Sequence, residues 1–542
     1  MNSTFLLGLV SVAAVAGAVA SPSFSPTTHF PTYAPTPDDQ GISVTNIDVL
    51  HWKDCGAKTK CGRLEFCQGG WNYGYRAING NGAVSSSSSC GSTPGPLIRM
   101  SKGVTYKLTL HNTASSPTNL HTHGLHIVGD GDGDDVTRVV QGGNTCLDYT
   151  WDIAADHPGG THWYHPHYHG KTNEQVAGGA FGMIIVEDDD EELSDWASNV
   201  ENERLLMVLL NNSGGSSGNG RWDRNLQLVA RHHDERYLPD SWYRLRTLIV
   251  TPDAEPNTLS FGSGCTVYKV ASDGVWHSAD LTAYEGSSFV LTGASRADFA
   301  VRCSAGSHVV SWGGTNIANI DARSEHGYIG GIVSSGDDAY DLGNAPTRPA
   351  SLGDLSTAVS IPSTNRFVVS PQKDSIRFNG SEYPGMSGLG DINYDEVYEL
   401  QVKDSHRHPF HMHLYHMQVV TPGGCGDHVE GEYYDTIAGA KDRPCTVRFR
   451  TSDIGQLLVL HCHELEHEDN GSINFMNVVN VPESRMNTVD SPSYACPAVM
   501  DDTSATSTED GASGIGNSSA TRCGSITLWL SLLLGFCVEL IV

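Results

Sequence analysis

Histidine is concentrated in four short segments of this chain. The sequence has 25 histidines among 542 residues, and the four segments are LHTHGLH (120–126), HWYHPHYHG (162–170), HPFHMHLYH (408–416) and HCHELEHED (461–469), each with an H-x-H triplet. On a β-strand, residues i and i+2 project from one face about 6–7 Å apart, so two imidazoles can bind one metal ion or bridge two. One such triplet is common on a polar strand. Four of them predict a metal centre.

The last segment also indicates which metal is bound. In His461-Cys462-His463 the thiol faces away from both imidazoles, His467 follows five residues after the cysteine, and His408 is available from the preceding segment. One thiolate with two imidazoles is the ligand set of blue-copper sites. The tripeptide would then connect that copper covalently to a second site. The alternative is a structural zinc ion, but a closed tetrahedral shell would leave the other histidine segments unexplained.

The elements that hold these segments are predicted to be strands. Runs such as VTYKLTLHN (104–112), RLLMVLLN (204–211) and QLLVLHCH (456–463) are short, rich in β-branched and large apolar residues, and bounded by turns. The 59 glycines also suit a turn-rich β protein. Short strands repeated over this length predict stacked β-sandwiches.

Two polar stretches divide the chain into three β units. EDDDEELSD (187–195) and GDDAYDLGNAPTRPASLGD (336–354) are natural boundaries, although the first could also be a solvated loop within one domain. The predicted domains are 40–190, 198–345 and 350–492.

The two ends of the chain predict export. Residues 1–20 read as a signal peptide that ends in Ala18-Val19-Ala20, and 21–39 as a Pro/Ser/Thr-rich stalk. A second stalk (501–524) precedes an apolar tail (525–542) without a basic flank. Such a tail fits a GPI-anchor signal better than a membrane-spanning anchor. We therefore expect the protein on the extracellular face of the plasma membrane, or secreted.

The cysteines and glycosylation triplets agree with that route. Of 13 cysteines, Cys523 and Cys537 would be removed with the tail, and Cys462 lies in the metal motif, which leaves ten for five disulfides. Cys265–Cys303 and Cys425–Cys445 are plausible local pairs, although the full pairing cannot be read from the sequence. The N-x-[ST] triplets begin at Asn211, Asn379, Asn470 and Asn517.

Together with GPLIRMSKGVTYKLTLHN (95–112), SRADFAVRC (295–303) and DIGQLLVLHCH (453–463), the histidine segments resemble the multicopper oxidases over about 40–490. The resemblance implies an all-β fold of three consecutive cupredoxin domains, which are Greek-key β-sandwiches, with a copper cluster between the first and third. HGKT at the end of the second segment and HEDNG at the end of the fourth are more similar to the bacterial metal-oxidase and spore-laccase branch than to fungal laccases.

The resemblance also implies four copper ions and a ligand for each coordination position. The type 1 copper takes His408, Cys462 and His467, and the type 2 copper takes His121 and His411. The ligands of the type 3 pair are His123, His165, His167, His413, His461 and His463. Four one-electron oxidations at type 1 copper would then reduce O2 to two waters at the other three ions.

Two acidic residues match positions that supply protons in that branch. Glu468 follows the ligand His467, and Asp132 lies eleven residues after His121. A carboxylate buried beside a metal can relay protons. The alternative for both is a solvated acidic loop.

The sequence departs from the family at the axial position of type 1 copper. Ten residues after Cys462, where the family has Met, Leu or Phe, this chain has Ser472. A hydroxyl is a poor ligand for copper bound to a thiolate, so the copper is either effectively three-coordinate or ligated by another residue. Met476 is four positions too far along for a simple exchange.

The electron donor has two candidate classes. The family oxidises phenols and aromatic amines, or ions such as Fe(II) and Mn(II). Asp404, four residues before His408, matches an acid of the metal-oxidising relatives, and His406 could join it in binding a cation. Glu464 and Glu466 add carboxylates nearby. The alternative is that Asp404 is simply an exposed loop acid, and we favour a laccase-like enzyme with phenolic or aromatic donors.

Composition excludes some other functions. With 62 acidic against 33 basic residues, the formal charge of −29 makes nucleic acid and anionic lipid poor partners.

Two other classes of copper protein fit the sequence less well. A copper-binding surface protein without turnover would be expected to have lost ligands, and none is missing. A copper nitrite reductase would lack four H-x-H triplets.

Overall fold

The computed structural model describes residues 48–69, 72–78, 93–188, 200–211, 225–231, 236–237, 239–253, 255–278, 284–322, 348, 352–357, 360–421, 423–440, 443–452, 454–482 and 492–496. The predicted signal peptide, both stalks, the C-terminal tail and the Asn517 triplet lie outside these ranges. Among the described residues there is no helix both long and apolar enough to span a bilayer.

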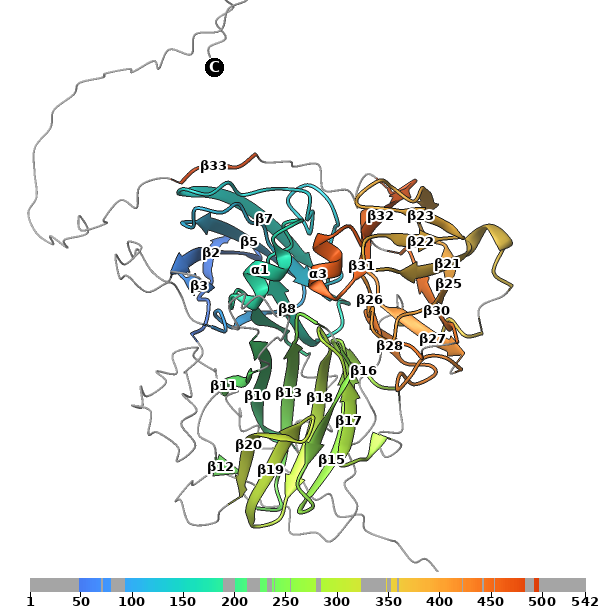
Figure 1. Cartoon of the computed structure of the whole chain (residues 1–542). Coiled ribbons are helices and arrows are strands. Elements are labelled where there is room, and N and C mark those ends of the chain that lie inside the picture. Colours follow the sequence, from blue (N-terminus) through green and yellow to red (C-terminus); the bar gives the residue numbers. More distant parts are fainter. Residues whose placement is uncertain are drawn as a thin grey trace, which may run out of the picture. The chain divides into compact units, whose positions relative to one another are not determined.

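The N-terminal part of the fold is a pair of sheets (Figure 1). One has the order β1-β2-β5-β7-β33, with β3 beside β2: β1 (Lys53–Gly56), β2 (Thr59–Gly69), β3 (Asn72–Ala77), β5 (Val104–Asn112), β7 (Thr145–Ile153) and β33 (Tyr494–Ala495). The other has the order β4-β9-β8-β6: β4 (Ile98–Met100), β6 (His121–His123), β8 (Gly160–His165) and β9 (Gly182–Val186). Leu64, Ile98 and Ile184 share one core cluster, so the two sheets pack face to face.

The middle part is a second pair of sheets. The first has the order β11-β10-β13-β18-β15-β16: β10 (Val200–Asn211), β11 (Asn225–Arg231), β13 (Trp242–Val250), β15 (Cys265–Ser272), β16 (Val275–Trp276) and β18 (Arg296–Cys303). The second has the order β12-β20-β19-β14-β17: β12 (Arg236–Tyr237), β14 (Asn257–Phe261), β17 (Ser288–Leu291), β19 (Gly306–Trp312) and β20 (Thr315–Ala322). Phe299 and Trp312 lie in their common core.

The C-terminal part is a third pair. One sheet has the order β23-β22-β21-β25-β30-β27-β28: β21 (Arg366–Pro371), β22 (Ile376–Phe378), β23 (Ser381–Tyr383), β25 (Val397–Val402), β27 (Met417–Thr421), β28 (Tyr433–Tyr434) and β30 (Cys445–Arg450). The other has the order β24-β32-β31-β26-β29: β24 (Asp391–Asn393), β26 (Phe410–Met412), β29 (Thr436–Ile437), β31 (Gln456–Cys462) and β32 (Ile473–Val479). The labelled helical elements are α1 (Thr172–Ala177), η3 (Ser363–Asn365) and α3 (Leu465–Asp469).

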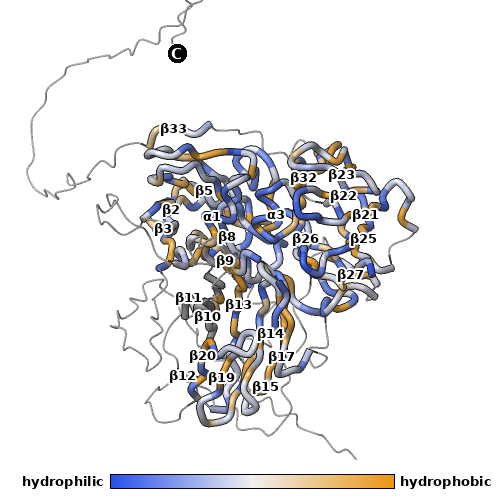
Figure 2. The backbone as a smooth tube through the Cα atoms, in the orientation of Figure 1, coloured by the Kyte–Doolittle hydropathy of each residue, from blue (hydrophilic) through white to orange (hydrophobic). Residues whose placement is uncertain are grey.

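Side-chain alternation explains these pairs of sheets. In β25, Tyr398, Leu400 and Val402 are buried while the residues between them are partly exposed, as expected for a strand with one face on a core. Figure 2 shows hydrophobic and hydrophilic residues interspersed along the strands. The predicted all-β fold is therefore confirmed. The predicted domain limits remain predictions.

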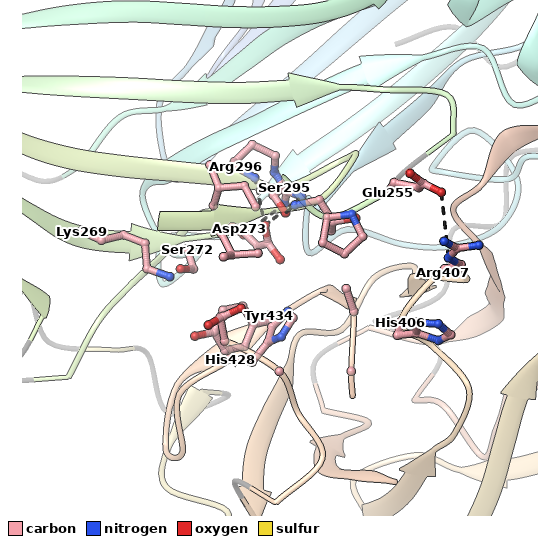
Figure 3. A pocket seen from close by; sticks show the side chains of 18 residues that line it. Glu255, Lys269, Ser272, Asp273, Ser295, Arg296, His406, Arg407, His428 and Tyr434 are labelled. Atoms are coloured by element: carbon pink, nitrogen blue, oxygen red, sulfur yellow. Dashed lines mark hydrogen bonds and ion pairs between the residues drawn. The ribbon is translucent and has the colours of Figure 1, made fainter. Parts of the chain in front are cut away.

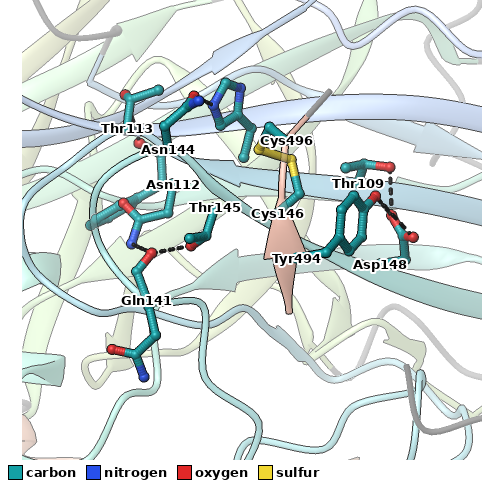
Figure 4. Close-up of a disulfide and its surroundings, with 12 residues drawn as sticks. Thr109, Asn112, Thr113, Gln141, Asn144, Thr145, Cys146, Asp148, Tyr494 and Cys496 are labelled. Atoms are coloured by element: carbon teal, nitrogen blue, oxygen red, sulfur yellow. Dashed lines mark hydrogen bonds between the residues drawn. A yellow bond between two sulfur atoms is a disulfide. The ribbon is translucent and has the colours of Figure 1, made fainter. Parts of the chain in front are cut away.

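Disulfides join several of these strands. The predicted pairs Cys265–Cys303 and Cys425–Cys445 are both present, as is Cys55–Cys61. A fourth disulfide, Cys146–Cys496, links residues 350 positions apart and fixes β33 beside β7 (Figure 4). There the Tyr494 hydroxyl donates to the Asp148 carboxylate at 3.0 Å. The end of the described chain is thus bound covalently to the first pair of sheets.

Candidate metal centre

Paired strands bring the histidine segments together. In the first pair of sheets β6 runs antiparallel to β8, with His121 opposite His165. In the third pair β26 runs antiparallel to β31, with His411 opposite His461 and Phe410 opposite Cys462. Since successive side chains on a strand alternate between faces, each H-x-H presents both rings to the same side.

Histidines from the first and third pairs of sheets meet in one buried cluster. Three groups of three donor atoms, each group within 4.8 Å, are formed by His121, His123 and His411; by His123, His165 and His463; and by His167, His413 and His461. The six residues predicted to hold the type 3 pair make up the second and third groups. The predicted type 2 pair, His121 and His411, lies in the first.

The donor atoms of this cluster fit a metal better than a hydrogen-bond network. His461 Nε2 lies 3.2 Å from His167 Nε2 and 3.2 Å from His413 Nε2. His121 Nε2 and His411 Nε2 are buried and have no hydrogen-bond partner in the described part of the chain. Buried nitrogen atoms normally have partners. Several unpaired imidazole nitrogens facing one another are the ligand chemistry of a transition metal.

Burial keeps these rings in the form that binds metal. It lowers the pKa of His121, His165 and His411 well below the ordinary value, and neighbouring histidines lower it further. Burial likewise lowers the pKa of His463 to about 3. Neutral imidazole is the metal-binding form of histidine.

Two carboxylates hold the outer nitrogens of the cluster. Asp134 Oδ2 accepts from His121 Nδ1 at 2.8 Å and lies 3.3 Å from His413 Nδ1. Asp435 Oδ1 accepts from His123 Nε2 at 3.1 Å, and the Asp435 carbonyl accepts from His411 Nδ1 at 2.9 Å. Such partners fix the orientation and tautomer of metal-binding rings.

Asp134, not Asp132, is the acid that contacts the histidine cluster. The family resemblance had implied Asp132 for this position. Asp132 pairs instead with Arg138, at 3.2 Å between Oδ1 and Nη2. The Asp134 amide donates to the Val128 carbonyl, and its Oδ1 accepts from the Thr122 amide, both at 2.8 Å. This tight loop turns the second of the two acids toward the cluster, so the assignment to Asp132 is corrected.

Asp435 was not identified from the sequence. It lies between β28 and β29, distant in sequence from the histidines that it contacts, and only the tertiary fold brings it there. Arg296, from β18 of the middle pair of sheets, is buried and donates from Nη1 to Asp435 Oδ1 at 2.9 Å. All three pairs of sheets therefore contribute to the surroundings of the cluster.

Glu468 contacts different histidines of the cluster from those that Asp435 contacts. Its Oε1 and Oε2 lie 3.4 Å from His167 Nδ1 and His461 Nδ1 respectively, and Oε1 accepts from the Thr172 hydroxyl at 2.9 Å. Burial raises the pKa of this carboxyl well above its ordinary value. Next to it, Asp469 accepts from the Gly170, Thr172 and Asn173 amides, which ties α3 to the start of α1.

Cys462, His408 and His467 form a second centre. Cys462 Sγ lies 3.7 Å from His408 Nδ1 and 3.8 Å from His467 Nδ1, and the two nitrogens are 3.0 Å apart. Cys462 is the free cysteine among the described residues, and burial raises the pKa of its thiol. One sulfur and two nitrogens at these separations can hold copper in a trigonal arrangement.

Ser472, ten residues after Cys462, lies beside this centre. Ser472 is fully buried, its carbonyl accepts from the Cys462 amide at 2.9 Å, and its hydroxyl donates to the Ser375 carbonyl at 3.2 Å. Met476 is paired with Leu458, four residues along β31 from Cys462. That separation is about 13 Å along a strand. Glu464, by contrast, lies 3.0 Å from His467 Nδ1.

The predicted donor-binding residues lie beside this second centre. Asp404 is exposed and accepts from the Ser370 hydroxyl at 2.7 Å. Its backbone is in the left-handed region, with φ of 56°. The pKa of His408 is lowered, mainly by burial and the nearby His467, against the opposing negative charges of Glu464 and Asp404. His406 is half-buried and lines a cavity described below.

Comparison with known proteins decides the family. Two multicopper oxidase family models match residues 72–191 and 356–483, the segments that carry all the histidine clusters. A multicopper oxidase of Staphylococcus epidermidis is 24% identical over 405 residues, covering 72% of this chain and 83% of the relative.

The chain belongs to the multicopper oxidase family.

Solved structures show the same fold for this multicopper oxidase. A laccase from Pediococcus acidilactici superposes with a TM-score of 0.61 at 19% identity, covering 81% of this chain and 94% of that one. A multicopper oxidase from Campylobacter jejuni, described as a metallo-oxidase, gives a TM-score of 0.59 at 19% identity and covers 83% and 100% of the two chains. The protein is accordingly an oxidoreductase that depends on copper.

Proposed function

We propose that this multicopper oxidase is laccase-like: it takes one electron at a time from phenolic or aromatic donors and reduces O2 to two waters, using four copper ions. The observation that carries the proposal is the tripeptide 461–463. Cys462 Sγ belongs to the second centre, while His461 and His463 belong to two different groups of the buried cluster. A covalent path therefore connects the two centres.

The residues at the two centres have different proposed roles. Copper, when bound, supplies the one-electron redox chemistry. His408 and His467 would hold copper at the outer site. Asp134 and Asp435 fix the orientation of His121 and His123 in the cluster by accepting hydrogen bonds from them. Glu468, buried between His167 and His461, is placed to hold and transfer a proton. Donor oxidation is thus kept apart from O2 reduction, which needs four electrons together.

A metal ion is the second candidate donor. Asp404 and Glu464 place carboxylates next to His408 and His467, and hard oxygen ligands suit Fe(II) or Mn(II). The Campylobacter jejuni structure is described as that of a metallo-oxidase, and the Pediococcus acidilactici structure as that of a laccase. A non-catalytic copper-binding role is disfavoured because this chain has a histidine or cysteine at every ligand position that the family resemblance implies.

O2 consumption by the copper-loaded protein tests both candidates. We expect a higher kcat/KM with 2,6-dimethoxyphenol than with Fe(II) or Mn(II). We expect Asp404→Ala to raise the KM for Fe(II) about fivefold, the scale of one exposed charge interaction. Asp391→Ala, at an exposed acid of the same pair of sheets, is the control. A selective loss of dominant Fe(II) or Mn(II) turnover in Asp404→Ala would make this a metal oxidase, and no uptake with any donor would refute oxidase function.

We also propose that the protein acts on the extracellular face of the plasma membrane, held there by a C-terminal anchor. The disulfides support exposure to an oxidising compartment. Asn379 and Asn470 of two N-x-[ST] triplets are exposed. Treatment of intact cells with a phosphatidylinositol-specific phospholipase should release the enzyme. Retention after treatment would indicate a membrane-spanning anchor, and absence from the cell surface and medium would contradict export.

A further inference from the structure

A cavity of about 390 Å³ lies between the middle and third pairs of sheets (Figure 3). Strands β15 and β17 and their loops form one wall, and the segments around 406 and 426–439 form the other. Glu255 and Arg407 pair across its rim at 4.0 Å, and both are substantially exposed, so the cavity reaches solvent. None of its lining residues is a ligand of either metal centre.

Lys269 is the unusual residue of this cavity. Its side chain comes from β15, and the residue is only 9% exposed. In the part of the chain that the structure describes, its ammonium forms no hydrogen bond and no ion pair with another side chain. Burial lowers its pKa, opposed by the more distant charges of Asp273, Asp427 and Glu432. The ammonium lines a cavity that reaches solvent, so an acceptor that enters the cavity can replace water on it.

The other buried charges are already matched. Arg296 is engaged by Asp435, and Asp273 Oδ1 accepts from the Arg296 amide at 3.0 Å. Glu432 accepts from the Ser278 hydroxyl at 2.7 Å and pairs with Arg348. Lys269 is therefore the buried charge left for a ligand, and a ligand that matches it is an anion.

The remaining walls suit a flat apolar body. Tyr434 is buried, and His428 is held by contacts of its ring nitrogens with the Cys425 and Thr436 carbonyls at 2.7 and 3.1 Å. Figure 3 shows these two side chains across the cavity from Lys269. Leu291 and Pro256 add apolar surface. The volume accommodates one substituted ring, not a polymer.

We propose that this cavity binds aromatic carboxylate donors, of the hydroxybenzoate class, with the carboxylate on Lys269. The inference rests on the proposed oxidase function and adds the substrate class. His406 lines the cavity and lies two residues before the copper ligand His408. Their Cα atoms are therefore at most about 7 Å apart. The His406 end of the cavity therefore adjoins the chain segment that carries this copper ligand.

The reaction balances without a further reagent. Each of four bound phenols gives one electron to the Cys462 centre and one phenolic proton to solvent, leaving a phenoxyl radical. Four electrons and four protons convert one O2 into two waters.

Kinetics with a matched donor pair test the role of Lys269. Syringate and 2,6-dimethoxyphenol share the same ring and methoxy groups and differ by one carboxylate. We expect Lys269→Met to raise the ratio of the KM for syringate to the KM for 2,6-dimethoxyphenol about 10- to 100-fold. This is the effect expected from the loss of one charged hydrogen bond. Lys269→Arg should largely retain the original ratio. Lys403→Met, at an exposed lysine beside Asp404, should not change it.

Binding without turnover separates this inference from the proposed function. 3,4,5-Trimethoxybenzoate has no phenolic hydroxyl, and calorimetry compares its Kd with that of its methyl ester. We expect the acid to bind at least about tenfold more tightly to the wild-type protein. Lys269→Met should abolish that preference. Equal binding of acid and ester by wild type, no binding of the acid, or a preference that survives in Lys269→Met would overturn the inference even if O2 consumption were normal.

Discussion

Cys462→Ser is expected to abolish the intense visible absorption of a copper–thiolate bond and to lower donor turnover by roughly three orders of magnitude. The residue is the one sulfur at the second centre, 3.7 and 3.8 Å from its two imidazole nitrogens. It is also the midpoint of the covalent path to His461 and His463. A hydroxyl in its place supplies neither a soft ligand nor a low-energy electron path.

The copper content shows whether the effect is local. We expect bound copper to fall from about four ions per chain to about three, because the histidine cluster has no ligand atom on Cys462. Met476→Leu is the matched control, since Met476 pairs with Leu458 well along the strand. A band lost in Met476→Leu would show that methionine binds the copper after all. An unchanged band in Cys462→Ser would contradict the assignment of this centre.

The pairing of rings within each histidine segment could be predicted because strand geometry is local. Each H-x-H triplet needs only the twofold alternation of a strand to place two rings on one face, and paired strands such as β6 and β8 then align His121 with His165. One of the two predicted local disulfides also follows strand pairing. Cys265 and Cys303 are directly opposite each other on paired strands.

The surroundings of the ligands were less predictable, because they depend on loops and distant contacts. The run GDGDGDD contains several acids, and counting from His121 selected Asp132. The turn in which Gly133 donates to the Asp130 carbonyl decides that Asp134 reaches the cluster instead. Asp435 was missed because its partners His123 and Arg296 are 312 and 139 residues away. The burial of Lys269 could not be predicted either, because part of the cavity around it is formed by residues of the third pair of sheets, which are distant in sequence.

Glu468→Gln is expected to slow O2 reduction about 100- to 1000-fold, the usual contribution of a positioned proton donor. The carboxylate is fully buried, contacts His167 and His461, and accepts from the Thr172 hydroxyl. Burial raises its pKa, which favours the protonated form that can donate. The amide keeps the shape and the contact with Thr172, but it cannot transfer a proton.

Measuring donor oxidation and O2 reduction separately shows which of the two steps depends on Glu468. Under anaerobic conditions, reduction of the Cys462 centre by 2,6-dimethoxyphenol should proceed at the wild-type rate in Glu468→Gln, whereas reoxidation of the reduced enzyme by O2 should be slow. Glu466→Gln, at an exposed acid on the same helix, should match wild type in both steps. Normal reoxidation in Glu468→Gln would refute the proton-donor role. Equal slowing of both steps would show instead that Glu468 only maintains the structure around His167 and His461.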